Sequence, residues 1–371
     1  MMPTTDELRI AVARRLLLED ALWIGDVLTS AFRHDGRART MVPLLFSGHA
    51  SRIAYEGREF LTSSNPDVAL PAFVEHLTDE EHPSIALARH ATKMLDNQTS
   101  KDKLLSDFEA EIHQAWMSQR TLLFKTVRRG FSWLQPDLGY YTLDGDVVGA
   151  TIPLHMRFGL DAVPQEDYPH FFAQFGEELF RSMRVYTYLS GGTDETATTL
   201  SLSPIDIVED NDRFVGRYLK RGYDKHLSLD QKLLLLLVES EVNTAAKLIP
   251  LLTGTHVAAA FRARLLSLWH ALSSLTKILN ALPSASSPAR DKVRQIVSSV
   301  DADRLSAPGM STVRNRSVHY EIRGKIQIAF SNTPMFGIVE SLTAETFESL
   351  DALVRDLSSE LSTALRDWRE A

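Results

Sequence analysis

The chain has 371 residues, of which 44% are hydrophobic and 24% charged, and its formal net charge is −8. These values predict a folded protein with a core along the whole chain and roughly two domains. The absence of cysteine excludes disulfides, thiolate zinc sites and a cysteine nucleophile. The acidic balance argues against a protein that coats nucleic acid nonspecifically.

No segment predicts a membrane span or a secretory leader. The longest apolar block, Leu233 to Val238, is much shorter than a transmembrane helix requires. The first seven residues lack the basic start and apolar run of a signal peptide. We therefore expect a soluble cytoplasmic protein without a membrane partner.

Residues 1–225 predict a mixed α+β domain. Three segments carry an apolar stripe at helical spacing opposite a polar face: residues 7–32, 67–95 and 102–128. Three others predict β-structure: a hairpin over 139–158 with its turn at Asp144-Gly145-Asp146, and strands over 185–189 and 198–208. The domain boundary is expected near residue 225, after the charged stretch from Glu209 to Lys225.

Residues 226–371 predict an all-α helical bundle, so the fold is mainly α overall. Ser228 and Gln231 form a capping-box pattern, and Ser287-Pro288 suits an N-cap and first helical residue. Apolar residues spaced by three and four predict five helices, over about 229–252, 257–279, 288–300, 309–324 and 347–368. Alternation over Lys325–Phe330 predicts a short extended segment between the last two helices.

The fourth of these helices carries Arg314-Asn315-Arg316-Ser317-Val318-His319. Asn315 and His319 are four residues apart and share one helix face, and the long Arg314 side chain can reach back toward it. The same spacing occurs at Arg221–His226, and a version one residue longer occurs at Arg264–His270. The first of these lies in a predicted loop and the second among core residues, so context distinguishes the Arg314 motif.

A guanidinium, an amide and an imidazole are the groups needed to cut RNA without a metal. The RNA's own 2′-hydroxyl would attack the adjacent phosphorus, His319 would transfer the proton, and Arg314 would stabilise the phosphoryl oxygens. We expect no metal and no cofactor. Two copies across a two-fold axis would bring two such sets around one phosphate. A local positive cluster is expected to bind the RNA: Arg316, Arg323 and Lys325.

Arg314, Asn315 and His319, in a late helix of a helical bundle, resemble the motif of the HEPN superfamily. The resemblance covers residues 226–371. It implies a metal-independent endoribonuclease that acts as a homodimer, often as a toxin or antiviral defence effector with an antitoxin or sensor partner. One HEPN branch has a tyrosine two positions after the histidine. Here Tyr320 is immediately next and Glu321 takes that place, so the resemblance does not extend to tyrosine AMPylation.

Two alternatives stay open at this point. Many HEPN domains are non-catalytic scaffolds, so the helical half is alternatively a module that binds a partner protein or a nucleotide. The other alternative is an enzyme whose site lies in residues 1–225, with the helical half serving for dimerisation. In the ribonuclease interpretation, the N-terminal domain would sense a trigger or restrain the nuclease.

Overall fold

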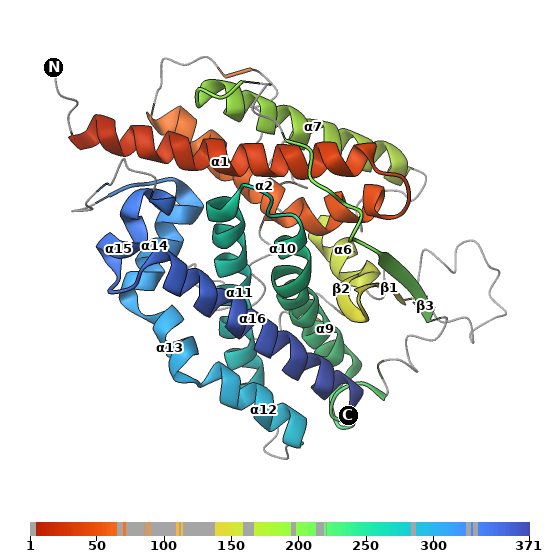
Figure 1. Ribbon diagram of the computed structural model, residues 1–371. Coiled ribbons are helices and arrows are strands. Elements are labelled where there is room, and N and C mark those ends of the chain that lie inside the picture. The colour runs from red at the N-terminus through yellow and green to blue at the C-terminus, as the bar shows by residue number, and fades with distance from the viewer. Residues whose placement is uncertain are drawn as a thin grey trace.

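The computed structural model describes residues 5–64, 70–71, 85, 88–89, 109–110, 113, 138–158, 167–193, 198–212, 219, 221–282, 287–323, 328 and 333–371. Over these residues the fold is mainly helical, with one small three-stranded antiparallel sheet (Figure 1). The helices expected over 67–95 and 102–128, and the extended segment expected over Lys325–Phe330, lie almost entirely outside the described residues.

Three long helices from the N-terminal part pack side by side (Figure 1): α1 (Thr5–Arg33), α2 (Ala38–Ser64) and α7 (Tyr168–Leu189). The first of these confirms the helix predicted over 7–32. Gly57 allows α2 to approach both neighbours closely. A Cβ at this position would lie 2.8 Å from the Tyr186 ring and 2.9 Å from Leu17 Cδ1, a separation that real Cβ atoms do not adopt.

The sheet has the strand order β2-β1-β3, formed by β1 (Leu138–Leu143), β2 (Asp146–Ala150) and β3 (Ile207–Asp212). Asp144 and Gly145 both have positive φ in the β1–β2 turn, which confirms the predicted hairpin turn. The second strand ends earlier than expected, at Ala150, and helix α6 (Thr151–Phe158) follows it. The strand predicted over 198–208 is wrong for most of its length, because strand structure begins only at Ile207.

The strand predicted over Val185–Leu189 is also wrong, since these residues form the last turns of α7. The β-branched and aromatic side chains favoured a strand locally. However, Leu179, Met183 and Tyr186 continue a helical stripe, and all three are buried. Burial of this stripe against α1 and α2 outweighs the local preference.

In the described residues of the C-terminal part, every regular element is a helix. Its elements are α9 (Leu229–Asn243), the π-helical turn η4 (Thr244–Leu248), α10 (Ile249–Leu251), α11 (Val257–Ala281), α12 (Pro288–Val297), α13 (Val300–Ser306), α14 (Pro308–His319), η5 (Pro334–Gly337), α15 (Ile338–Leu342) and α16 (Phe347–Glu370). The capping box at Ser228 and Gln231 is confirmed in both directions, with two hydrogen bonds of 3.1 Å. Ser287 caps α12 as predicted.

Two of the expected helices differ in extent. The third ends at Val297, and a separate helix that the sequence did not predict, α13, follows it with Ser299 as its N-cap. The fourth ends at His319 instead of near Gly324, because Tyr320 adopts the left-handed conformation with φ 52° and ψ 25°. The motif histidine is therefore the last helical residue.

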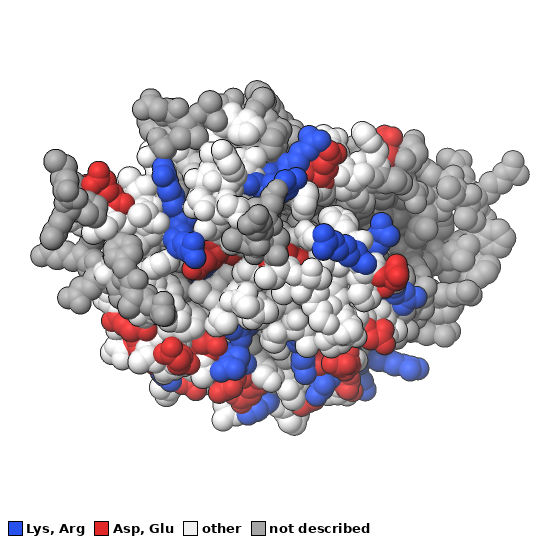
Figure 2. Space-filling model, turned by 45° about the horizontal axis from the view of Figure 1, so that its top comes forward, with Lys and Arg blue, Asp and Glu red and all other residues white. Residues whose placement is uncertain are grey.

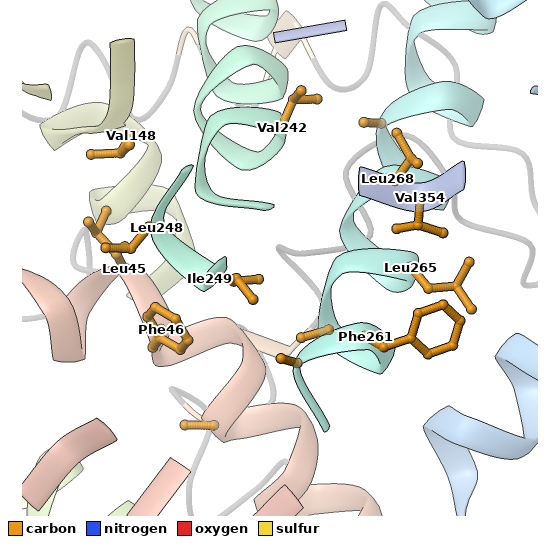
Figure 3. Close-up of a cluster of buried hydrophobic side chains, with 14 of the residues drawn as sticks. Leu45, Phe46, Val148, Val242, Leu248, Ile249, Phe261, Leu265, Leu268 and Val354 are labelled. Atoms are coloured by element: carbon orange, nitrogen blue, oxygen red, sulfur yellow. The ribbon is translucent and has the colours of Figure 1, made fainter. Parts of the chain in front are cut away.

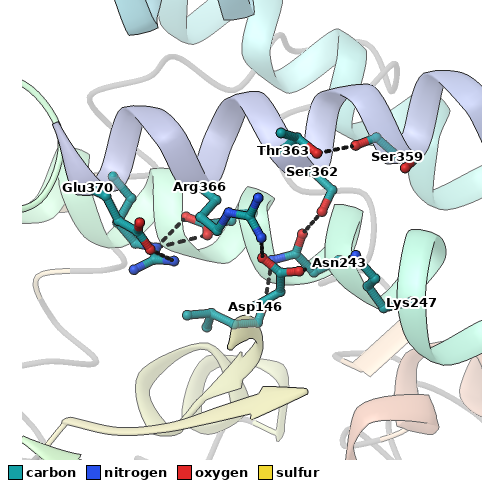
Figure 4. A network of polar contacts seen from close by, with 11 residues as sticks. Asp146, Asn243, Lys247, Ser359, Ser362, Thr363, Arg366 and Glu370 are labelled. Atoms are coloured by element: carbon teal, nitrogen blue, oxygen red, sulfur yellow. Dashed lines mark hydrogen bonds and ion pairs between the residues drawn. The ribbon is translucent and has the colours of Figure 1, made fainter. Parts of the chain in front are cut away.

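The last residue of α9 and the first residue of the π-helical turn after it both form hydrogen bonds with the edge strand β2 (Figure 4). Asn243 donates from Nδ2 to the carbonyl oxygen of Val147 at 2.8 Å, and Thr244 donates to that of Val148 at 3.3 Å. Ser362 of α16 donates to Asn243 Oδ1 at 2.6 Å. These bonds join the sheet to two helices of the C-terminal part and satisfy edge carbonyls that would otherwise lack partners.

Buried apolar side chains from both parts of the chain form one cluster. Figure 3 labels buried side chains of this cluster that come from α2, β2, α9–α11 and α16: Leu45, Phe46, Val148, Val242, Leu248, Ile249, Phe261, Leu265, Leu268 and Val354. The core is thus continuous across residue 225, and the boundary near that residue stays a prediction.

A buried carboxylate at the centre of this packing binds three helices together. Asp20 of α1 accepts hydrogen bonds from Arg52 of α2 at 3.1 Å and from Arg262 of α11 at 2.6 and 3.0 Å. The Tyr320 hydroxyl donates to the same carboxylate at 2.7 Å. We call these four residues the Asp20 network, and all four side chains are buried.

Burial by itself would raise the pKa of the Asp20 carboxyl. The positive charges of Arg262 and Arg52, with the hydrogen bonds from Arg262 and Tyr320, instead hold that pKa below its usual value. Asp20 is therefore ionised at neutral pH. Its charge compensates guanidinium groups that could not be buried alone.

Asp20→Asn should lower the free energy of unfolding by about 3–5 kcal/mol, because it leaves buried guanidinium groups without their shared counter-charge. Urea denaturation followed by circular dichroism measures this loss. Asp6→Asn is the matched control, since it breaks the exposed Asp6–Arg9 pair of α1 and should leave stability nearly unchanged. A loss below about 1 kcal/mol for Asp20→Asn would show that the network is not needed for the fold.

Candidate functional site

The predicted motif lies on α14, close to the end of the helix. Asn315 and His319 are exposed on the same face of the helix, whereas Arg314 is buried, with 9% of its surface exposed. α14 packs against α2 from the N-terminal part and against α11. The helical setting of the motif is therefore confirmed, and its surroundings come from distant parts of the chain.

His319 forms a dyad with a carboxylate that the sequence analysis did not single out. His319 Nδ1 lies 2.7 Å from Oε2 of Glu56, in the last third of α2. The His319 side chain is 45% exposed, whereas that of Glu56 is only 6% exposed. One edge of the imidazole thus contacts a buried anion, and part of the side chain is open to solvent.

Arg89 holds the other oxygen of the Glu56 carboxylate. It donates from Nε to Oε1 at 2.9 Å, and its guanidinium lies 4.0 Å from the centre of the Tyr55 ring. Burial would raise the pKa of Glu56. The hydrogen bond from His319, together with the charges of Arg89 and His319, keeps that pKa below its ordinary value.

The ionised state of Glu56 decides the proton arrangement of the dyad. An ionised carboxylate only accepts hydrogen bonds, so the proton of the His319–Glu56 contact belongs to His319 Nδ1. Nε2 is then the ring nitrogen that can take a proton from, or give one to, a substrate. A histidine oriented by a carboxylate in this way is the arrangement that general acid–base catalysis uses.

Arg314 is held by two neighbours. Its guanidinium lies 4.5 Å from the centre of the Trp269 ring of α11. It also donates from Nε and Nη2 to Asn315 Oδ1, at 3.2 and 2.9 Å. The side chain therefore does reach toward the residue that shares a face with His319. Asn315 therefore orients the guanidinium. Among the described residues, it forms no hydrogen bond with the His319 imidazole.

The residues expected to bind RNA are only partly described. Arg316 donates to the backbone oxygen of Glu321 at 3.0 Å, and Arg323 forms an exposed ion pair with the Glu321 carboxylate at 2.6 Å. Lys325 lies outside the described residues. On the face drawn in Figure 2, basic and acidic side chains are interleaved among the described residues around a broad uncharged area. The role of Arg316 and Arg323 in RNA binding stays a prediction.

The two other arginine–histidine pairs have the settings that the sequence predicted for them. Arg264 and His270 are buried on α11, and Arg264 is paired with Asp351 of α16 at 2.6 Å. His226 is exposed in a turn before α9. Of the three pairs, only the Arg314 motif joins a half-exposed histidine to a buried carboxylate.

Sequence reasoning missed Glu56 and Arg89 because nothing near either residue marks it. Glu56 is one of several polar residues along α2, and it lies 263 positions from His319. Arg89 falls 33 positions after Glu56, in a segment where few residues are described. The packing of α2 against α14 is what brings Glu56 to His319.

Comparison with family models, with curated proteins and with solved structures gave no match to this chain. Within the described part of the chain, no helix is long and apolar enough to cross a membrane. The same residues contain no group of three or more His, Asp or Glu side chains placed to ligate a metal ion. The site is therefore interpreted from its own geometry.

Glu56→Gln should destabilise the protein in a pH-dependent manner. The folded-state pKa of Glu56 is lowered, so its ionised form contributes stability above the ordinary value of 4.5, and this contribution is lost as the pH falls through the folded-state pKa. The difference in unfolding free energy between the wild type and the variant should be full at pH 7 and shrink below pH 4.5. Urea unfolding at pH 7, 5, 4 and 3 measures it.

Glu59→Gln is the matched control for this experiment. Glu59 is on the same helix, exposed, and paired with Arg58 at 2.6 Å. Its substitution should have little effect at any of these pH values. A difference for Glu56→Gln that stays constant from pH 7 to pH 3 would contradict a charge-based role.

Proposed function

We propose that this protein is a cytoplasmic, metal-independent endoribonuclease whose site is built on Arg314, Asn315 and His319. The observation that carries the proposal is the His319–Glu56 dyad. The imidazole is half-exposed and its Nδ1 is bound to a buried carboxylate. Nε2 is therefore the nitrogen that would exchange a proton with a substrate. The resemblance of the α14 motif to the HEPN superfamily supports the same chemistry.

The reaction requires two proton transfers. The 2′-oxygen of the RNA attacks the adjacent phosphorus while a base removes the 2′-hydroxyl proton. The bond from phosphorus to the 5′-oxygen breaks, and an acid protonates that oxygen. The products are a 2′,3′-cyclic phosphate and a 5′-hydroxyl. One His319 cannot be both the base and the acid in a single step, so we propose that two copies of the chain each supply one.

Arg314 would bind the phosphoryl oxygens as charge develops there. Its stacking on Trp269 and its bonds to Asn315 pre-orient the guanidinium, which limits the cost of ordering it in the transition state. The burial of Arg314 also favours one alternative, a non-catalytic HEPN-like module that binds a partner. In that case the arginine serves the fold, and His319 forms part of a binding surface.

We propose that residues 226–371 form an all-α domain that carries the motif, and that residues 1–225 form an α+β domain that controls it. Glu56 supports this division of roles, because a residue of the N-terminal part holds the imidazole of the C-terminal part. A toxin or antiviral defence role, with an antitoxin or sensor partner, follows from the resemblance and is part of the proposal.

The purified protein, incubated with single-stranded RNA in EDTA, should release fragments that end in 2′,3′-cyclic phosphate. DNA of the same sequence should remain intact, because it lacks the 2′-hydroxyl. His319→Ala should reduce the rate of cleavage by about 100-fold or more, through the loss of acid–base catalysis. Denaturing gel electrophoresis and end-group analysis measure the rate and the chemistry.

His226→Ala is the matched control for this assay. His226 is exposed and follows Arg221 with the same spacing, but it lies in a turn outside α14. Its substitution should leave cleavage unchanged. Equal activity of the His319→Ala protein and the wild type would overturn the proposal. Absence of cleavage by the wild type would favour the non-catalytic module.

A composite site also predicts a homodimer. Sedimentation equilibrium should give the mass of two 41.6 kDa chains at assay concentrations. Excess His319→Ala protein, exchanged with the wild type, should lower the activity per wild-type chain, because mixed dimers lack one histidine. Excess His226→Ala protein should not. A monomeric protein that cleaves RNA at full rate would contradict the shared site.

A further inference from the structure

The Asp20 network lies directly beside the His319–Glu56 dyad, and the two share the same elements. Arg52 and Glu56 are four residues apart on α2 and therefore share one helix face. Tyr320 and His319 are consecutive residues at the end of α14. Arg52 and Tyr320 meet on the Asp20 carboxylate, while Glu56 and His319 bind each other. Two parallel connections thus join α2 to the end of α14.

Tyr320 adopts a backbone conformation that is unfavourable for a tyrosine. Its φ of 52° places it in the left-handed region, where a helix end usually has glycine or asparagine. A residue with a Cβ is sterically disfavoured there. The hydrogen bond to Asp20, and packing of the ring 6.2 Å from that of Phe60, hold the residue in place.

We propose that Tyr320 is a positioning residue for His319. By anchoring the residue after His319 to a buried carboxylate, it ends α14 at the histidine and sets the orientation in which the imidazole meets Glu56. The network adjoins the His319–Glu56 dyad through this backbone connection and through α2. The expected effect of Tyr320 on the cleavage rate rests on the proposed ribonuclease function. Its expected effect on the orientation of the imidazole rests on geometry alone.

The ionisation states suit a permanent anchor. Burial, and next the negative charge of Asp20, raise the pKa of the Tyr320 phenol well above its ordinary value, so the hydroxyl remains a donor. Arg262 and Arg52 keep the Asp20 carboxyl ionised. The Tyr320–Asp20 hydrogen bond is therefore charge-assisted over the working range of pH, which makes it stronger than a bond between neutral groups.

Tyr320→Phe tests the inference, because it keeps the ring and removes only the bond to Asp20. Tyr223→Phe is a close structural match. Tyr223 is also buried, has a φ of 58°, and donates from its hydroxyl at 2.7 Å to a buried carboxylate, Glu239, which is paired with Arg369 near the C-terminal end of α16. Each variant loses a hydrogen bond from a tyrosine hydroxyl to a carboxylate, at a residue whose backbone is in the left-handed region. Only one of them adjoins His319.

We expect Tyr320→Phe to lower kcat about 10- to 100-fold with KM nearly unchanged, since a small misplacement of a catalytic group has effects of this size. NMR spectra of the protein with labelled histidine rings should show a shifted or broadened His319 signal, assigned by its absence in His319→Ala. Tyr223→Phe should change neither kcat nor the His319 signal. Both measurements are made under solution conditions in which urea unfolding shows that both variants are folded.

An unchanged His319 signal and unchanged kcat in Tyr320→Phe would overturn the inference, as would equal changes in the two variants. If the wild type cleaves no RNA while the His319 signal still moves only in Tyr320→Phe, the ribonuclease proposal fails and the positioning role stands. Should Tyr320→Phe not fold in buffer alone, both measurements are made on the variant and the wild type in trimethylamine N-oxide, which favours the folded state, and the same two outcomes decide.

Discussion

The arrangement of this protein depends on the buried carboxylate of Asp20. A carboxylate and guanidinium groups without access to water are tolerated only when their charges and hydrogen bonds are matched. Asp20 accepts hydrogen bonds from Arg52, Arg262 and Tyr320, and Glu19 supplies Arg262 with a second counter-charge. These residues come from α1, α2, α11 and the end of α14, so the network fixes the relative placement of four elements that are distant in the sequence.

The candidate site follows from this placement. Because α2 is held against the end of α14, Glu56 lies within hydrogen-bonding distance of His319. The exposed imidazole is therefore supported by groups that solvent does not reach, which is how a catalytic side chain keeps one orientation. A displacement of α2 relative to α14 would break the dyad. A residue of the N-terminal part of the chain thus binds directly to the motif that lies in the C-terminal part.

The fold was predictable where the determining interactions are local. The capping box at Ser228, the N-cap at Ser287 and the apolar spacing of α11 and α16 operate within a few residues, and each is confirmed. The prediction for Val185–Leu189 was wrong because β-propensity was weighed without the burial of α7. The early end of α14 depends on a left-handed tyrosine, which no local rule anticipates, because its partner is Asp20.

The sequence by itself determined α1, the main helices of the C-terminal part, the hairpin turn and the presence of an arginine, an amide and a histidine on one late helix, but it did not predict α2 or α7. Only the tertiary structure decided that the partners of Asp20 are Arg52, Arg262 and Tyr320, and that Glu56 binds His319. The physical reason is the separation along the sequence over which each interaction acts. Capping and periodicity act over a few residues, whereas the pairing of buried charges depends on which helix faces pack together.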